Sequence, residues 1–175
     1  MAGSLHQNAQ SAAGGRPSPL PSVDRMKSAG LIPYRSTPNG PEILIAHPGG
    51  PFWARRQVGA WSIIKGEIPP GEEPLATAVR EFHEETGWRI DVDHVIALGD
   101  VTQKAGKTIT AFAVEADFVT SEIAGDTVTI TYRGNEITFP EIDEVRWCGK
   151  AECERLLNPA QVTYYERLNT ALHAR

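Results

Sequence analysis

Two kinds of hydrophobic spacing alternate along the chain and predict a mixed α/β domain. Short runs of β-branched and aromatic residues, bounded by Gly, Pro, Asn and Asp, are typical of strands. Longer stretches with an apolar residue every three or four positions are typical of helices. The expected strands cover residues 26–34, 42–46, 61–64, 95–98, 108–118, 127–133, 136–139 and 144–148, and the expected helices cover 73–86, 150–157 and 160–173.

The expected helix at 73–86 has the most distinct start and end. Pro74 suits the first helical turn, where its missing N–H is no loss, and Gly87 is typical of the position just after a helix. Between them one mostly apolar stripe repeats at i, i+4, i+7 and i+11 and can pack against a sheet. The stripe consists of Leu75, Val79, Phe82 and Thr86.

Three carboxylates, Glu81, Glu84 and Glu85, lie close together on this helix. At about 100° per residue they centre roughly 130° away from the apolar stripe, which predicts that they lie outside the core. A solvated acidic surface is one interpretation, but like charges at i, i+4 repel and the helix has no lysine to offset them. Grouped hard oxygen ligands suit Mg2+ or Mn2+ together with substrate phosphate oxygens. The cluster therefore predicts a divalent cofactor and a phosphorylated ligand.

The segment just before the helix connects this cluster to the expected strand at 61–64. Residues 65–72 contain two glycines and two prolines, which is typical of a loop. Gly66 is expected to let the chain turn tightly beside the metal ions. A strand, a loop and an acidic helix would then form one compact site.

The stretch 66–88 resembles the signature of the Nudix hydrolases at all of its defined positions. These positions are Gly66, Glu72, Arg80, Glu81, Phe82, Glu84, Glu85, Gly87 and Trp88. The resemblance implies an α/β/α sandwich around a mixed β-sheet. It also implies metal-dependent hydrolysis of a nucleoside diphosphate linked to another moiety, as in a nucleoside triphosphate, a dinucleoside polyphosphate or a nucleotide sugar. The alternative is a catalytically silent Nudix-like module that binds a nucleotide or RNA, which the intact carboxylate set disfavours.

The same resemblance implies roles for individual residues. Glu81, Glu84 and Glu85 would hold the divalent cations. Arg80 would orient this acidic group, and Glu72 would brace the loop or the outer metal shell. Glu81 is also a candidate for the general base that accepts a proton from the attacking water.

A further acid is expected near the last strand, because Nudix hydrolases often place a metal ligand or base in the loop before it. Glu141, Asp143 and Glu144 lie there. Glu141 is the favoured candidate among the three, and an acidic surface turn is the alternative.

Candidate substrate-binding residues lie in the segments around the signature. The Gly- and Pro-rich stretch 47–57 carries Trp53, Arg55 and Arg56, which could stack on a base and bind phosphate. Lys65 and Lys104 could contact phosphate as point charges. The alternatives are a rim of the core for Trp53 and a solvated turn for Lys104.

Composition limits the classes of binding partner and indicates the cellular compartment. The chain has 175 residues and a formal charge of −5, which argues against a nucleic-acid coat or an anionic membrane and favours a small phosphorylated ligand. Its two cysteines, Cys148 and Cys153, are expected to be reduced structural thiols in a cytoplasmic protein. Residues 1–25 are expected to be a disordered tail and 26–175 one domain, for which a homodimer is possible.

Overall fold

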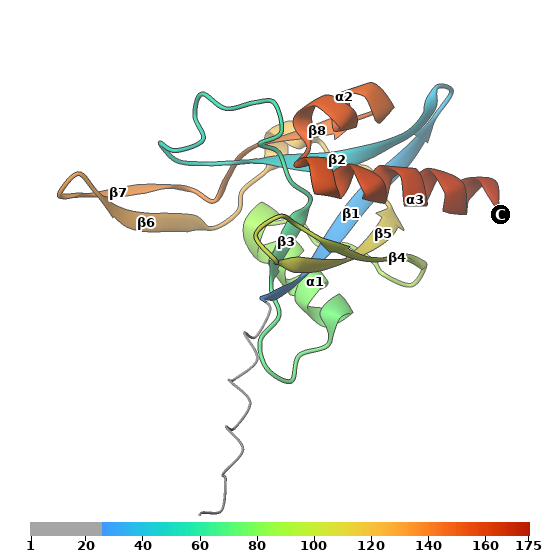
Figure 1. The fold of residues 1–175 in the computed structure, drawn as a ribbon, viewed down its shortest axis with the longest axis horizontal. Helices are drawn as coiled ribbons and strands as arrows, with labels where there is room; N and C mark the ends of the chain where they lie inside the picture. Colours follow the sequence, from blue (N-terminus) through green and yellow to red (C-terminus); the bar gives the residue numbers. More distant parts are fainter. Residues whose placement is uncertain (1–25) are drawn as a thin grey trace, which may run out of the picture.

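The computed structural model describes residues 26–175, so the tail expected at 1–25 lies outside the described residues. The chain forms one six-stranded sheet, a separate two-stranded hairpin and three α-helices (Figure 1). The sheet strands are β1 (Lys27–Thr37), β2 (Gly40–Pro48), β3 (Ile64–Glu67), β4 (Val95–Thr102), β5 (Thr108–Glu115) and β8 (Ile142–Cys148). The hairpin strands are β6 (Thr127–Tyr132) and β7 (Asn135–Pro140), and the helices are α1 (Pro74–Thr86), α2 (Lys150–Leu156) and α3 (Val162–His173). Short 3-10 turns lie at Thr120–Glu122 and Pro159–Gln161.

The sheet is mixed, with the order β4-β5-β1-β2-β8. β1 pairs with β5 in parallel, and the other pairs are antiparallel. β1 changes partner along its length: residues 28–31 pair with β3, and residues 34–37 pair with β2. The sheet therefore divides at this point, and β3 brings the start of the signature next to the central strand.

Helices cover both faces of the sheet. α1 packs over β1 and β3 around a core that includes Phe82, and α3 lies on the opposite face over a second core that includes Trp61 and Tyr164 (Figure 1). All three of these aromatic side chains are fully buried. The predicted α/β/α sandwich around a mixed sheet is confirmed.

Buried polar contacts fix α3 and its approach. The side chain of Gln161 is fully buried, accepts a hydrogen bond from the Ile63 N–H at 2.8 Å and donates one to the Ser62 hydroxyl at 3.1 Å. Tyr165 donates its hydroxyl to the Pro41 carbonyl at 2.8 Å. These bonds satisfy groups that would otherwise be costly to bury.

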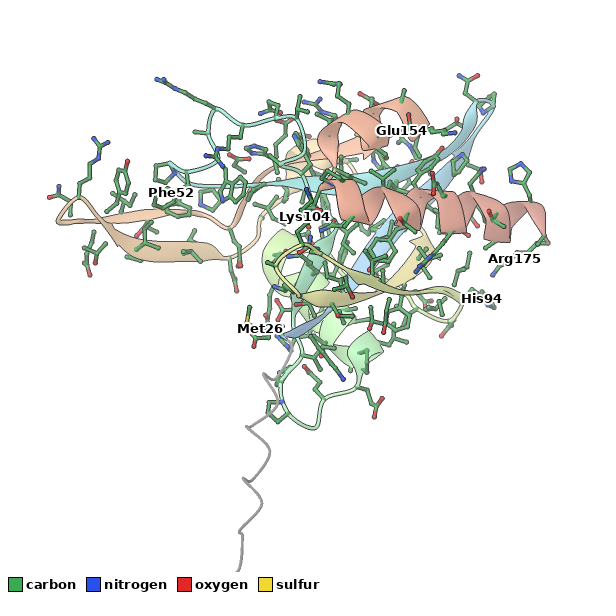
Figure 2. The ribbon with its side chains drawn as sticks, in the orientation of Figure 1. Met26, Phe52, His94, Lys104, Glu154 and Arg175 are labelled. Carbon is green, nitrogen blue, oxygen red and sulfur yellow. The ribbon has the colours of Figure 1, made fainter. Side chains whose placement is uncertain are left out.

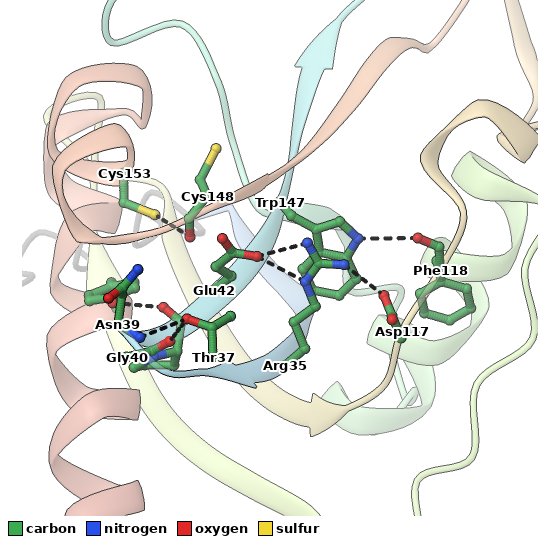
Figure 3. A network of polar contacts seen from close by, with 12 residues as sticks. Arg35, Thr37, Asn39, Gly40, Glu42, Asp117, Phe118, Trp147, Cys148 and Cys153 are labelled. Carbon is green, nitrogen blue, oxygen red and sulfur yellow. Dashed lines mark hydrogen bonds and ion pairs between the residues drawn. The ribbon is translucent and has the colours of Figure 1, made fainter.

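An ion-pair network centred on Arg35 joins β1, β2 and the segment after β5 (Figure 3). Arg35 donates to Glu42 at 2.9 Å and to Asp117 at 3.0 Å, and its guanidinium lies 4.6 Å from the ring centroid of Trp147. The Trp147 indole N–H donates to the Phe118 carbonyl at 3.1 Å. The network holds the chain where it leaves β5 against β8, and so fixes the base of the segment that leads to the hairpin.

The strand predicted at 61–64 is wrong in its position. Trp61 and Ser62 form only isolated bridges, whereas β3 runs from Ile64 to Glu67 and includes residues expected to be a loop. Gly66 is therefore in an extended strand paired with Ala29 rather than in a tight turn. The other predicted strands and helices are present, with ends displaced by a few residues.

The predicted hairpin forms and projects away from the sandwich (Figure 1). Its turn residues are Arg133 and Gly134, which both have positive φ, 51° and 83°, as in a primed turn. The turn lies one residue before the Gly134-Asn135 pair that separates the two expected strands. We call β6, the turn and β7 the arm. Within residues 26–175 no helix is long and apolar enough to cross a membrane.

Candidate active site

Arg80 joins three acidic side chains at the start of the site. Its guanidinium donates to Glu72 at 2.9 and 3.2 Å, to Glu81 at 2.9 Å and to Glu84 at 3.0 Å. Thr77 also donates to Glu72 at 2.7 Å. The hydrogen bonds from Arg80, and then that from Thr77, hold the pKa of Glu72 below its usual value. The same bond to Glu72 raises the pKa of Arg80. Arg80 therefore links the loop before α1 to the acidic face of the helix.

Glu81 lies directly against the backbone of β3. A Cβ built on Gly66 would lie 1.9 Å from Cδ of Glu81, so only glycine leaves room for this carboxylate. The Glu81 side chain is 17% exposed. Gly66 thus allows β3 and α1 to pack closely. Gly87 ends α1, as predicted, and has a φ of 77°.

Glu85 does not lie outside the core as predicted, because it is only 8% exposed. The buried stripe of α1 contains Ala78 and Phe82, and Glu85 continues it at i+7 from Ala78. Leu75 and Val79, which were expected to form that stripe, are half-buried at its margin. Burial, and then the charge of Glu141, raises the pKa of Glu85 to about 8.

Glu141 lies with these carboxylates, although it is far away in the sequence. Burial is the main cause of its raised pKa, followed by the charges of Glu81 and Asp126. Its N–H donates to the Asp126 carbonyl at 3.0 Å, and the Asp126 N–H donates to the Glu84 carbonyl at 2.8 Å. The segment that leads into the arm is therefore attached to the C-terminal end of α1, and Glu141 is attached to that segment.

Sequence reasoning missed Asp126. A Cβ on the preceding Gly125 would lie 1.8 Å from the Glu85 carbonyl oxygen, so this glycine allows the segment to approach α1. The sequence signal for Asp126 was the isolated glycine before it, in Ala124-Gly125-Asp126, because such a glycine is compatible with close approach of another backbone segment. Nothing in the sequence indicated that the approach is to α1.

Lys65 contributes a cation to the same region. Burial, and then the charge of Lys107, lowers its pKa, while Glu85, Glu141 and Glu81 oppose this shift. Lys107, in the turn between β4 and β5, therefore lies near Lys65. Lys104 is exposed in the turn between β4 and β5, and its predicted contact with phosphate stays a prediction.

The carboxylates suit a divalent cation chemically but do not already surround one. Within the described part of the chain, no group of three His, Cys, Asp or Glu side chains has a geometry that could hold a metal ion. Burial nevertheless raises the pKa of both Glu85 and Glu141, and the charges of neighbouring carboxylates raise both further. A hard divalent cation relieves repulsion of this kind by binding the carboxylate oxygens. The donor set therefore fits Mg2+ or Mn2+ in its chemistry.

The loop that carries the predicted substrate-binding residues is anchored beside Glu141. His47 is 2% exposed, and its ring nitrogens lie 2.7 Å from the Asp143 carboxylate and 2.7 Å from the Arg56 carbonyl. The Gly49 N–H donates to the Glu141 carbonyl at 3.0 Å. These contacts hold the loop after β2 against Glu141 and the start of β8.

Trp53, Arg55 and Arg56 are exposed on this loop and line a hollow of about 460 Å³. The Arg56 guanidinium lies 5.8 Å from the ring centroid of Trp53. Phe52, labelled in Figure 2, meets Tyr132 of the arm edge-to-face at 5.4 Å between ring centroids. A larger hollow of about 710 Å³ lies along Leu75, Val79 and Trp88, but its walls are mainly apolar and unsuited to phosphate.

A family model described as the NUDIX domain matches residues 25–168. A Mycobacterium tuberculosis protein provisionally named 8-oxo-dGTP diphosphatase 3 is 31% identical over 159 residues, covering 84% of this chain and 63% of that protein. An Agrobacterium fabrum RNA pyrophosphohydrolase is 26% identical over 114 residues, covering 59% of this chain and 55% of that protein. The chain thus spans less than two thirds of the length of these relatives.

Solved structures share the fold at low sequence identity. An Ap4A hydrolase of C. elegans aligns with a TM-score of 0.57 and 19% identity over 86% of this chain and 99% of that chain. The NUDIX domain of Shewanella oneidensis NrtR, solved with ADP ribose, aligns with a TM-score of 0.56 and 13% identity, covering 85% of this chain and 88% of that chain. These likenesses support the fold and leave the substrate open.

Proposed function

Because the chain belongs to the NUDIX domain family, we propose that it hydrolyses a phosphoanhydride bond in a nucleoside diphosphate linked to another moiety. A nucleotide with a 5′-triphosphate is the first substrate to test, since the names of two relatives describe an 8-oxo-dGTP diphosphatase and an RNA pyrophosphohydrolase. Dinucleoside polyphosphates and nucleotide sugars are the other members of the class. The observation that carries the proposal is the grouping of Glu81, Glu85 and Glu141 around Lys65.

Glu81, Glu84 and Glu85 would hold the divalent metal, with Glu141 as a further ligand or as the base. When bound, Mg2+ or Mn2+ neutralises phosphate charge and lowers the pKa of the attacking water. Arg80 positions the carboxylates through the hydrogen bonds that it already makes to Glu81 and Glu84.

Residues around the carboxylate cluster would accept the proton and bind the phosphates. Glu81 or Glu141 would accept the proton of the attacking water, because each is a carboxylate beside the other acids. Lys65 would contact the phosphates as a point charge, supported by the nearby Lys107. A half-buried lysine close to acids suits a substrate that brings its own negative charge.

The loop 49–58 would bind the rest of the nucleotide. Arg55 and Arg56 can donate paired hydrogen bonds to phosphate oxygens, and Trp53 offers a face for a base. The anchoring of the Arg56 carbonyl by His47 supports this assignment, since it keeps the backbone beneath these side chains in place. Two free, buried thiols support a reducing compartment, and we propose the cytoplasm.

The test is a panel of nucleoside triphosphates, oxidised triphosphates, 5′-triphosphorylated RNA, dinucleoside polyphosphates and nucleotide sugars, each with Mg2+ or Mn2+. Released phosphate, pyrophosphate and nucleoside monophosphate identify the bond that is cleaved. We expect turnover that EDTA abolishes and that Glu81→Gln, Glu84→Gln and Glu85→Gln each reduce. Tight nucleotide binding without turnover across the panel would instead support the silent binding module. Unchanged turnover in all three variants would contradict the site.

A further inference from the structure

The arm has two free edges in the described part of the chain. β6 and β7 pair only with each other, and neither joins the six-stranded sheet. An isolated two-stranded hairpin is at best marginally stable in water. Its outer N–H and C=O groups are also a template for a further strand. The arm therefore needs either strong protection or a partner.

The two edges differ in how they are protected. β7 contains Glu136 and ends at Pro140, and a charge and a proline are both common ways of blocking strand addition. β6 reads Thr-Val-Thr-Ile-Thr-Tyr and has no charge, no proline and no glycine. Such a run of β-branched and aromatic residues is favourable for pairing. β6 is thus the edge that can accept a strand.

The arm also has one apolar face. The cross-strand pairs Val128–Phe139 and Ile130–Ile137 lie on it, and all four of these side chains remain half-buried. Phe52 covers the end near Tyr132 and is itself 59% exposed. The Phe139 ring also lies close to Gly50, so in a single chain only part of this apolar face remains accessible to solvent.

We infer that β6 pairs antiparallel with β6 of a second copy of this chain, which would form a four-stranded sheet across a two-fold axis. An antiparallel pair with this symmetry keeps equivalent faces on the same side of the sheet. The apolar rows of the two copies then continue into one another, and Thr129 and Ile130 lie next to the axis. The uncharged sequence of β6 makes its edge self-complementary, because no like charges meet across the axis.

This pairing would reach the candidate site through the base of the arm. The arm begins just after Asp126 and ends just before Glu141, and the backbones of these two residues are hydrogen bonded at 3.0 Å. The inference goes beyond the proposed function and does not depend on it, since the arm could pair in an active or a silent protein.

Two matched lysine variants test the inference. Thr129 and Thr138 lie opposite each other on the exposed polar face and share one hydrogen bond of 2.7 Å, so replacing either residue removes the same contact. Only Thr129 lies on β6. We expect the full chain to be a dimer by sedimentation equilibrium. Thr129→Lys should weaken dimerisation about tenfold or more by placing two charges near the axis, whereas Thr138→Lys should change it little.

Two matched cysteine variants keep the inference testable if the lysine variants disrupt the structure of the arm. Under mild oxidation, Thr129→Cys should form a disulfide-linked dimer much faster than Thr138→Cys, while the native Cys148 and Cys153 stay buried. A monomeric wild-type chain across a wide concentration range would overturn the inference. So would a dimer that both lysine variants leave intact, or equal crosslinking rates for the two cysteine variants. Nucleotide turnover is not a readout here, so failure of this test leaves the proposed function unaffected.

Discussion

The carboxylate of Glu81 occupies the space that a side chain at position 66 would need, with 1.9 Å between Cδ of Glu81 and a Cβ built on Gly66. The contact joins β3 to α1 and positions one acid of the site. Gly66→Ala should therefore push Glu81 away and lower kcat strongly. Overpacking of this kind should also cost about 1–3 kcal/mol of stability.

Gly149 provides the matched control for that substitution. A Cβ at Gly149 meets nothing within 4 Å, and its φ of −81° is ordinary for any residue. Gly149→Ala should leave kcat nearly unchanged, and any loss of stability should reflect only the preference of the α2 N-cap for glycine over alanine. If Gly66→Ala were as active as Gly149→Ala, Glu81 would not need its present position.

Glu85 gives a pH-dependent prediction for the metal-free protein. Its folded pKa is raised to about 8, mainly by burial, from the usual value of 4.5. A raised folded pKa contributes stability below pH 4.5, and this contribution is lost as the pH rises toward 8. In EDTA, the melting temperature of Glu85→Gln relative to wild type should therefore increase from pH 5 to pH 8. At pH 8, added Mg2+ should stabilise wild type more than the variant.

Thermal melts of both proteins at several pH values, with EDTA and with Mg2+, measure this difference. Glu122→Gln is a suitable control, because Glu122 lies in a short 3-10 turn in which no residue is buried. A constant difference between Glu85→Gln and wild type across the pH range would argue against a raised pKa at Glu85.

The position of Glu85 shows where sequence reasoning reached its limit. The spacing of acids on α1 and their link to Arg80 follow from the sequence, because helical geometry fixes which residues are neighbours. The buried face of α1 does not follow from hydrophobicity alone. Gly66 allows close approach, so small Ala78 and even Glu85 are buried while Leu75 and Val79 remain at the margin.

Long-range neighbours were harder still to predict. Glu141 was expected near the site from family resemblance, but Asp126 reaches it through backbone hydrogen bonds to Glu84 and Glu141 that the sequence did not indicate. The hairpin could be predicted from the two strand patterns on either side of Gly134-Asn135, although the turn itself lies one residue earlier, at Arg133 and Gly134. That the hairpin would project from the sandwich depends on tertiary packing, which the local pattern does not contain.

The two cysteines should react slowly in the folded protein. Burial, and then the charge of Glu152, raises the pKa of Cys148 to about 12, and burial also raises the pKa of Cys153. Since the thiolate is the reactive form, iodoacetamide should modify neither residue appreciably at neutral pH. Mass spectrometry should detect both modifications once guanidinium unfolds the chain. Rapid labelling of the native protein would contradict the buried positions.

Arg80 should act by positioning, because it contacts Glu72, Glu81 and Glu84 together. Arg80→Ala is expected to lower kcat roughly 10–100-fold, as losses of groups that orient metal ligands do. It should also raise the concentration of Mg2+ needed for half-maximal activity. Arg80→Lys should rescue little, since one ammonium cannot reproduce the forked contacts.

Arg89 is the control for Arg80, because it is exposed just beyond the end of α1. Arg89→Ala should keep both kcat and the Mg2+ requirement near wild-type values. An Arg80→Ala enzyme with a normal Mg2+ requirement would show that the arginine is not needed to orient the acids.

Arg55 and Arg56 should act mainly on substrate binding, since they lie on the exposed loop rather than among the carboxylates. A charged hydrogen bond to phosphate contributes about 1.5–3 kcal/mol, so Arg55→Ala and Arg56→Ala should each lower kcat/KM about tenfold or more. The loss should appear in KM, with kcat little changed. Arg155→Ala, on the exposed side of α2, should change neither value. A fall in kcat at constant KM would place these arginines in the chemical step and contradict a binding role. Displacement of the loop would not explain such a result at Arg56, because His47 contacts the backbone carbonyl of this residue and not its side chain.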